Sequence, residues 1–283
     1  MKYLITGFKG QLGYDVVREL EKRGYKDYLA LDIDDMDITD AKQVNDVVST
    51  YNPDVIVHCA AWTQVDRAEE EILKCYDVNV VGTRNIAQAA LGIDAKMIYI
   101  STDYVFDGTK DGLYEPEDKP NPKSIYGFTK YLGELETKEN PKHFIARVSW
   151  VFGINGNNFI KTMLRLSETR RELNVVNDQV GSPTYTVDLA KILVDMSETE
   201  EYGTYHVTNE DFCSWAEFAE YIFNSNNIEM KVNKITSDEY PQKAYRPRNS
   251  KMEKVKLLEK GFTKLPTWQN AVDRYNIELK EHK

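Results

Sequence analysis

Short apolar runs alternate with longer stretches of helical period through the first 150 residues, and this alternation constrains the fold more than any other feature. The apolar runs predict strands at residues 2–6, 28–31, 54–60, 96–101 and 143–150. Apolar residues at helical spacing predict helices at residues 12–23, 41–51, 77–91 and 125–138. Because the strands are apolar almost throughout, both faces of their sheet must be covered. The pattern predicts an α/β fold, a doubly wound parallel sheet of the Rossmann type.

The alternation weakens after residue 150, which indicates a smaller and less regular region. Here the sequence predicts helices at 158–169, 187–197 and 215–223, and strands at 173–177 and 203–207. We expect one domain over residues 1–150 and a smaller, interleaved region over 151–283. Pieces near 173–190 and 203–209 are expected to return to the first domain. Residues 107–123, rich in Asp, Gly, Pro and Lys, predict a loop or lid.

Composition excludes several classes of protein and partner. With 36 Lys and Arg against 46 Asp and Glu, the net charge of −10 disfavours nucleic acid and anionic membrane surfaces. The N-terminus does not read as a signal peptide, and no apolar window is long enough to span a membrane. Cys59, Cys75 and Cys213 are scattered, which argues against disulfides and a structural zinc site. We expect a cytoplasmic protein without a metal site, and read the acidic run 69–71 as a solvated helix start.

Three glycines follow the first predicted strand and open the first helix. Gly7, Gly10 and Gly13 stand in GFKGQLG, where glycines let the backbone turn tightly beside a pyrophosphate held at a helix N-terminus. Asp32 ends the second predicted strand about 20 residues further on, where its carboxylate can accept from ribose hydroxyls. The sequence thus predicts that residues 1–150 bind a dinucleotide. Asp32 would repel a 2′-phosphate and Lys9 would offset it, so NADH and NADPH both stay open.

A tyrosine and a lysine lie one helical turn apart in the predicted helix 125–138. Tyr126 and Lys130 have a spacing that places both side chains on one face of that helix. Among 18 tyrosines such spacing alone means little, but its position is informative. Thr102 ends the fourth predicted strand, at the edge where open α/β sheets bind ligands. These three side chains are therefore candidates for one catalytic site.

Taken together, these motifs resemble the extended short-chain dehydrogenase/reductase superfamily and, within it, the dTDP-4-dehydrorhamnose reductases. The resemblance covers most of the chain and is carried by GQLG (10–13), AAWTQVDRAEEE (60–71), STDYVFDG (101–108), YGFTK (126–130), RVSWVFG (147–153), GNNF (156–159), NDQVGSPT (177–184) and RPRNS (246–250). It implies reduction of the 4-keto group of dTDP-4-dehydro-L-rhamnose to dTDP-L-rhamnose, for surface polysaccharide, by NADPH or NADH. It also implies that residues 151–283 mainly bind the substrate.

The resemblance further implies roles for individual residues. Tyr126 would donate the proton, Lys130 would lower the pKa of Tyr126, and Thr102 would hold the reacting oxygen. The cofactor-binding residues would be Gly7, Gly10, Gln11, Leu12, Gly13, Asp32, Asp37, Ile38, Ala60, Ala61, Trp62, Thr63, Tyr126 and Lys130. The substrate-binding residues would be Thr102, Asp103, Trp150, Asn158 and Arg246.

Several alternatives stay open at this point. Trp150 is equally compatible with core packing, Asn158 with a helix cap, and Arg246 with a solvated surface. An epimerase of the same superfamily would keep its cofactor bound, and a non-catalytic regulatory subunit would bind a cofactor without turnover. A dehydratase is disfavoured, because Thr102 is followed by Asp103 and Tyr104 rather than by an Asp-Glu pair. A homodimer is compatible with the sequence.

Overall fold

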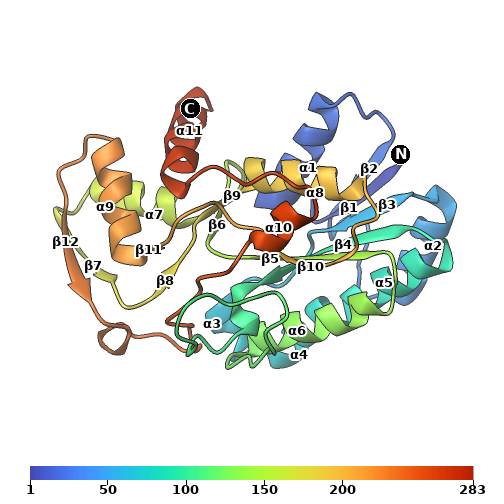
Figure 1. Cartoon of the computed structure of the whole chain (residues 1–283), viewed down its shortest axis with the longest axis horizontal. Coiled ribbons are helices and arrows are strands. Elements are labelled where there is room, and N and C mark those ends of the chain that lie inside the picture. Colours follow the sequence, from blue (N-terminus) through green and yellow to red (C-terminus); the bar gives the residue numbers. More distant parts are fainter. Residues whose placement is uncertain (283) are drawn as a thin grey trace.

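The computed structural model describes residues 1–282, and a sheet of six parallel strands lies at its centre (Figure 1). In spatial order the strands are β10 (Gly203–His206), β5 (His143–Val148), β4 (Lys96–Thr102), β3 (Val55–His58), β1 (Tyr3–Thr6) and β2 (Tyr28–Leu31). Every neighbouring pair runs parallel. The predicted α/β fold with a Rossmann-type sheet is confirmed.

Helices cover both faces of this sheet, as the apolar strands require. One face is covered by α1 (Gln11–Lys22) and α8 (Thr186–Ser197), and the other by α2 (Ala41–Tyr51), α5 (Thr83–Gly92) and α6 (Ile125–Lys138) (Figure 1). The side chains of β1 alternate between the two layers: Ile5 packs with Leu20 and Leu193, whereas Leu4 packs with Val44 and Ile86. The central strands are therefore buried on both sides.

Two predicted elements differ from the structure near the sheet. The predicted strand 143–150 ends at Val148, because the backbone of Trp150 has a φ of 50°, and a separate strand β6 follows (Val151–Phe152). The predicted helix 77–91 begins earlier. It continues α4 (Ile72–Tyr76) through a π-helical turn (Asp77–Gly82) into α5, and a short helix α3 (Val65–Ala68) precedes it. The first difference lies at the carboxyl end of β5, and the second lies in the segment between β3 and α5.

The second half builds a smaller layer with its own core. Its elements are α7 (Phe159–Ser167), β7 (Glu172–Val176), β8 (Val180–Gly181), β9 (Thr184–Tyr185), β11 (Cys213–Ser214), α9 (Trp215–Ser225), β12 (Lys231–Ile235) and α11 (Trp268–Glu281), with a 3-10 turn at Ser237–Glu239. Aromatic side chains dominate that core, among them Phe152, Phe218 and Tyr275. Outside this layer, α10 (Val255–Glu259) packs beside β10, and a 3-10 turn at Asp103–Val105 follows β4.

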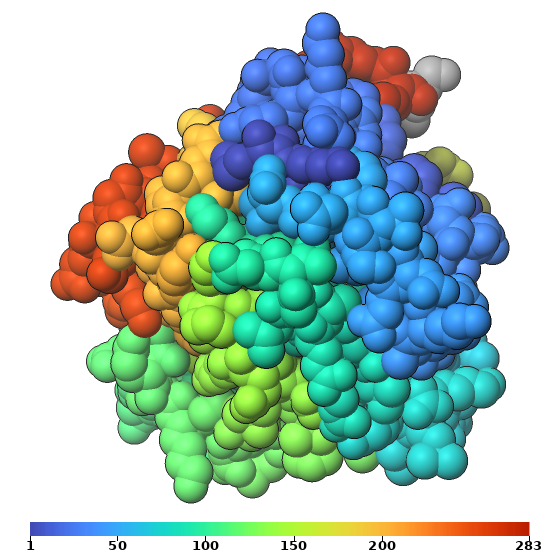
Figure 2. All heavy atoms as spheres, turned by 90° about the vertical axis from the view of Figure 1, so that its right-hand side faces the viewer, coloured from blue at the N-terminus to red at the C-terminus, as the bar shows by residue number. Residues whose placement is uncertain are grey.

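The second half also contributes to the central sheet. As expected, β10 joins the sheet beside β5, and α8 packs on α1. The strand predicted at 173–177 does not return to it: β7 pairs with β12 in a separate sheet, because its apolar side chains Leu173 and Val175 pack in the smaller core. Figure 2 shows that the first 150 residues, blue to green, form most of one end of the molecule, with later residues in gold and orange along its left side. The division at residue 150 stays a prediction.

Candidate active site

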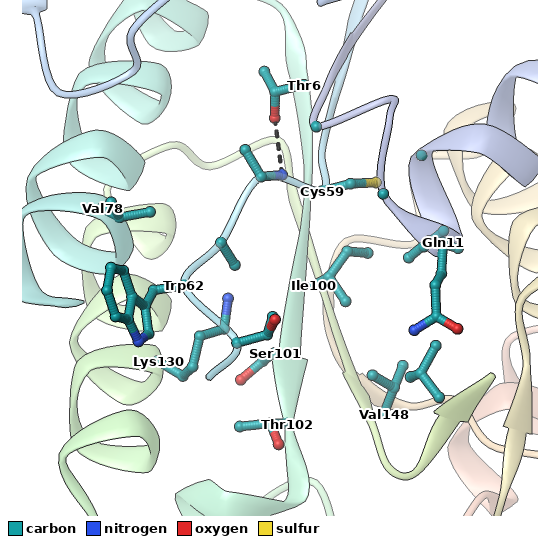
Figure 3. A pocket seen from close by; sticks show the side chains of 18 of the residues that line it. Thr6, Gln11, Cys59, Trp62, Val78, Ile100, Ser101, Thr102, Lys130 and Val148 are labelled. Carbon is teal, nitrogen blue, oxygen red and sulfur yellow. Dashed lines mark hydrogen bonds between the residues drawn. The ribbon is translucent and has the colours of Figure 1, made fainter. Parts of the chain in front are cut away.

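A cleft of about 820 Å³ opens at the carboxyl ends of the parallel strands. Its lining includes the last residues of four strands, Thr6, Leu31, Thr102 and Val148. In Figure 3, Gln11 and Val148 lie on one side of this pocket and Trp62, Val78 and Lys130 on the other, with β4 between them. The cleft crosses the point where β1 has β2 on one side and β3 on the other, which is where open α/β sheets bind ligands.

The glycine loop lies against the backbone after β3. Gly7 has a φ of 68°, and a Cβ at this position would lie 2.7 Å from the amide nitrogen of Ala60. A Cβ at Gly13 would overlap the carbonyl oxygen of Gly7. No side chain caps α1 at Gly10, so the first amide groups of this helix face the cleft without a side-chain partner. The loop and helix start therefore fit a pyrophosphate.

All of the predicted cofactor-binding residues line this one cleft. They are Gly7, Gly10, Gln11, Leu12, Gly13, Asp32, Asp37, Ile38, Ala60, Ala61, Trp62, Thr63, Tyr126 and Lys130. Ala60 is fixed by its amide, which donates to Thr6 Oγ1 at 3.2 Å (Figure 3). Trp62 is fixed by its amide, which donates to Asn79 Oδ1 at 2.8 Å. Residues far apart in the sequence thus form a single continuous surface.

Helix α6 presents Tyr126 and Lys130 to the same cleft. The helix begins after Ser124, whose hydroxyl accepts from the amide of Gly127 at 3.1 Å. Lys130 extends from α6 toward Ser101 on β4 in Figure 3, and its Nζ lies 4.0 Å from the centroid of the Tyr99 ring. The Tyr126 ring packs edge-to-face on Tyr104, with centroids 5.4 Å apart. The predicted helix thus places the phenol and the ammonium as expected.

Burial determines the protonation of both groups. It lowers the pKa of Lys130 to about 7, an effect that the buried carboxylate of Glu134 opposes. Burial raises the pKa of Tyr126, and contact with the Thr102 hydroxyl only partly offsets this. The net shift of the Tyr126 pKa is upward because desolvation of the phenolate dominates, and the expected lowering of this pKa by Lys130 stays a prediction. Tyr126 is a protonated phenol at neutral pH.

A buried carboxylate lies next to Thr102. The Thr102 hydroxyl donates to Asp103 Oδ1 at 2.9 Å, and the Ser250 hydroxyl donates to Asp103 Oδ2. Asp103 is 2% exposed, and burial raises its pKa to about 6 against the opposing effect of these hydrogen bonds. Because the Thr102 proton is directed to Asp103, Thr102 must redirect it before it can donate to a ligand.

Beneath this group lies an ion pair that sequence reasoning missed. Arg147 donates through Nε and Nη2 to the two carboxylate oxygens of Glu134, each at 2.8 Å, and both side chains are almost wholly buried. Ser101, which lines the cleft, donates to Glu134 Oε1 at 2.6 Å. Glu134 lies one turn after Lys130 on α6. The pair therefore joins α6 to the ends of β4 and β5 directly below the catalytic candidates.

Two tryptophans form an aromatic wall of the cleft. Trp150, predicted to bind substrate, stacks on Trp215 with ring centroids 3.7 Å apart. Trp215 was not predicted, because it is the first residue of α9 and no local pattern connects it with the strand ends. Other lining residues that sequence reasoning missed include Cys59, Ser101, Tyr104 and Asn157. The motif STDYVFDG contains Ser101 and Tyr104 and was the signal available for them.

Two predicted substrate-binding residues do not line the cleft. Asn158 caps α7: its Oδ1 accepts from the Lys161 amide at 3.0 Å, and its Nδ2 donates to the carbonyl of Gly153 at 2.8 Å. Arg246 pairs with Asp66, with Nη2 and Oδ2 2.7 Å apart. Residues 107–123 form the expected loop but are also absent from the lining, because Tyr114 and Asn249 join this loop to the segment before α10.

No helix within residues 1–282 is long and apolar enough to cross a bilayer.

Comparisons with known proteins agree with one another. The RmlD substrate binding domain family matches residues 1–280. A dTDP-4-dehydrorhamnose reductase of Aggregatibacter actinomycetemcomitans is 41% identical over 285 residues, covering 96% of this chain and 97% of that protein. A spore coat polysaccharide biosynthesis protein of Bacillus subtilis is 41% identical over 278 residues, covering 97% and 96%. The crystal structure of the Bacillus anthracis dTDP-4-dehydrorhamnose reductase in complex with NADP is 44% identical, with a TM-score of 0.95 and coverage of 98% and 100%.

Proposed function

This chain belongs to the RmlD substrate binding domain family, and on that premise we propose that it reduces the 4-keto group of dTDP-4-dehydro-L-rhamnose to give dTDP-L-rhamnose. The observation that carries the proposal is the convergence of Tyr126, Lys130 and Thr102 on a cleft that also holds the glycine loop. A phenol, an ammonium and a hydroxyl beside a dinucleotide site are the groups that a carbonyl reduction needs. The product feeds surface polysaccharide synthesis.

The proposed reaction divides between cofactor and protein. NADH or NADPH, held by the residues predicted for it, supplies the hydride to C4 of the sugar. As the C=O double bond opens, its oxygen takes the proton of the Tyr126 hydroxyl. The raised pKa of Tyr126 keeps that proton in place until it is needed, and the Lys130 ammonium stabilises the phenolate that remains. A proton from solvent then restores Tyr126.

The remaining residues are proposed to orient the substrate. Thr102 redirects its hydroxyl from Asp103 to the keto oxygen, while Asp103 stays bound to Ser250. Trp150 and Trp215 offer an apolar face for the sugar or the thymine ring. Arg246 reaches the diphosphate by leaving Asp66, and Asn158 acts through the start of α7, which it caps, rather than by contact. Residues 1–150 mainly bind the cofactor and 151–283 mainly the substrate.

Turnover of the purified protein tests the proposal. NADH or NADPH is followed by absorbance with dTDP-4-keto-6-deoxy-sugar generated in the same cuvette by its upstream epimerase, and oxidation should require that sugar. Tyr126→Phe should lower kcat by about 10²- to 10⁴-fold and leave the Kd for NADH almost unchanged. Tyr131→Phe, on the same helix but outside the cleft lining, is the matched control. Full turnover by Tyr126→Phe would overturn the mechanism.

The alternatives give different results in the same assay. An epimerase would carry bound NAD through purification and show no net oxidation. A regulatory subunit would bind the cofactor without turnover of any sugar nucleotide. Either result would replace the reductase proposal.

We also propose a cytoplasmic homodimer without a nucleic-acid partner. The three free cysteines fit a reducing compartment, and the net charge of −10 opposes nucleic-acid binding. Exposed apolar side chains on α4 and α6 support dimerisation, among them Leu73, Phe128 and Leu135. Light scattering behind size exclusion should give a dimer mass that Leu73→Asp converts to a monomer mass.

A further inference from the structure

We infer that the side chain of Gln11 is a positioning residue for the substrate side of the cleft, although its backbone belongs to the glycine motif. Gln11 is the first residue of α1, and the family resemblance places it with the cofactor. The inference rests on the proposed function, because it divides Gln11 between the two ligands of that reaction. The backbone faces the dinucleotide, and the carboxamide holds the segment that supports the sugar-nucleotide wall.

Within residues 1–282, every hydrogen-bond partner of the Gln11 carboxamide lies in the segment 153–158, between β6 and α7. Oε1 of Gln11 accepts from the Gly153 amide at 3.0 Å and from Asn158 Nδ2 at 3.2 Å. The aliphatic part of the side chain lies against Gly156, where a Cβ would be 3.5 Å from Gln11 Cγ. The side chain thus contacts the segment at its beginning, middle and end.

These hydrogen bonds fix which way the carboxamide is turned. Asn158 Oδ1 accepts from the Lys161 amide at 3.0 Å, so the other polar atom of Asn158, Nδ2, is the donor that faces Gln11. The Gly153 amide is also a donor, so both partners require an oxygen at this end of Gln11. In Figure 3 the Gln11 nitrogen accordingly points to the middle of the pocket. The carboxamide cannot turn over without losing both hydrogen bonds.

A second side chain attaches the same segment to the glycine loop. Asn155 Nδ2 donates to the carbonyl of Lys9 at 2.7 Å, and Asn155 does not line the cleft. Lys161 holds the segment from the side of α7, with Nζ donating to the carbonyls of Ile154 and Gly156. The segment is therefore fixed between the glycine loop and α7.

This segment leads into the aromatic wall of the cleft. Asn157 lies in the lining, and Phe159 packs on Trp215 with ring centroids 4.7 Å apart. Trp215 in turn stacks on Trp150. Loss of the Gln11 contacts would release a segment that supports this wall, so we expect it to weaken binding of the sugar nucleotide more than hydride transfer.

Steady-state kinetics and calorimetry of Gln11→Met test the inference. Met keeps the backbone amide and a side chain of similar length but provides no carboxamide oxygen. At saturating NADH, KM for the sugar nucleotide should rise about ten-fold, whereas kcat should fall less than about three-fold and the Kd for NADH should change less than about two-fold. General loss of folding would instead lower kcat by reducing the active fraction and leave KM unchanged.

Asn155→Ala separates positioning from direct contact by the Gln11 nitrogen. Because Asn155 lies outside the cleft lining, its loss can act on the substrate only through the segment. KM should rise about three-fold in this variant, again with the Kd for NADH changed less than about two-fold. A wild-type KM in Asn155→Ala beside a raised KM in Gln11→Met would assign Gln11 a direct contact with the ligand and overturn the positioning role.

Gln88→Met is the matched control. It makes the same chemical change at an exposed position of α5, outside the cleft lining, and should leave KM, kcat and the Kd for NADH unchanged. A wild-type KM in Gln11→Met would overturn the inference and leave the proposed reductase intact. A rise in the Kd for NADH as large as the rise in KM would also overturn it, by returning the side chain to the cofactor. Absence of sugar-dependent oxidation by the wild type would overturn the proposed function and this inference together.

Discussion

The indole rings of Trp150 and Trp215 stack with centroids 3.7 Å apart and an interplanar angle of 14°, although Trp150 directly precedes β6 and Trp215 is the first residue of α9. Trp150 adopts a φ of 50°, which is unfavourable for a bulky side chain, and its carbonyl accepts from the Thr184 amide at 3.2 Å. The stack and this hydrogen bond hold Trp150 in a conformation that directs its ring along the cleft. Trp215 therefore supports Trp150 and forms part of the same wall.

Replacing Trp215 should weaken substrate binding selectively. Trp215→Leu removes the stacking partner of Trp150 and should raise KM for the sugar nucleotide by about ten-fold, since an aromatic pair contributes about 1 kcal/mol. The Kd for NADH should change less than about two-fold, because Trp215 is not among the predicted cofactor-binding residues. Steady-state kinetics and calorimetry measure the two quantities. Tyr221→Phe, on the same helix, is the control, and an unchanged KM in Trp215→Leu would refute the shared wall.

The activity should depend on the charge of Lys130. Because burial lowers the pKa of Lys130 to about 7, its ammonium is lost as the pH rises through that value. We expect kcat/KM to fall above about pH 7, and Lys130→Met to lower activity by about 100-fold and to abolish this limb. Lys138→Met, exposed near the end of the same helix, should keep the wild-type profile. A wild-type profile that is flat from pH 6 to 9 would contradict this role for the ammonium.

The same pKa has a consequence for stability. The folded pKa of about 7 lies below the ordinary value of 10.5, so between these values the unfolded chain binds more protons and stability rises with pH. Below pH 7 the fold bears the full cost of burying the ammonium. Lys130→Met should therefore raise the free energy of unfolding relative to wild type, and more at pH 6 than at pH 10. Urea titrations of both proteins at pH 6 and pH 10 measure the gain in the free energy of unfolding. An equal gain at the two pH values would show that the fold does not bury Lys130 as a charge.

The buried pair Glu134–Arg147 should behave differently from a surface pair. Arg147→Met leaves the Glu134 carboxylate buried without its partner and should cost about 3–5 kcal/mol of stability, measured by urea unfolding. Arg147→Met combined with Glu134→Leu should recover most of this loss. Glu172→Gln breaks the exposed contact with Lys231 and should cost less than about 1 kcal/mol. A double variant no more stable than Arg147→Met would show that the pair does not act as a unit.

Asn158 separates a capping role from substrate contact. Asn158→Asp keeps the oxygen that accepts from the Lys161 amide, whereas Asn158→Ala loses the cap and should cost about 1 kcal/mol in urea unfolding. If Asn158 acts only through the structure, KM should follow stability across the two variants. A KM that rises equally in both variants, despite their different stabilities, would instead support direct contact between Asn158 and the substrate.

The sequence predicted those parts of the fold and site that depend on local pattern. The ends of the central strands follow from apolar runs bounded by polar residues, and the positions of Gly7, Tyr126 and Lys130 follow from those ends. Trp215 and Arg147 escaped prediction because their roles depend on partners distant in sequence, Trp150 and Glu134. The rise in the Tyr126 pKa that burial causes could not be predicted either, because spacing reveals a neighbouring charge but not the extent of burial.

Strand β10 and helix α8 have a consequence for the order in which the chain is made. When the first 150 residues have left the ribosome, five of the six strands exist, but β5 still has an open edge and the apolar side chains Val16 and Leu20 of α1 lack their partners on α8. Both are supplied only when synthesis has passed residue 206. The central sheet therefore cannot complete its packing until most of the chain has been synthesised. A chaperone that shields an open sheet edge would act on this protein late in translation.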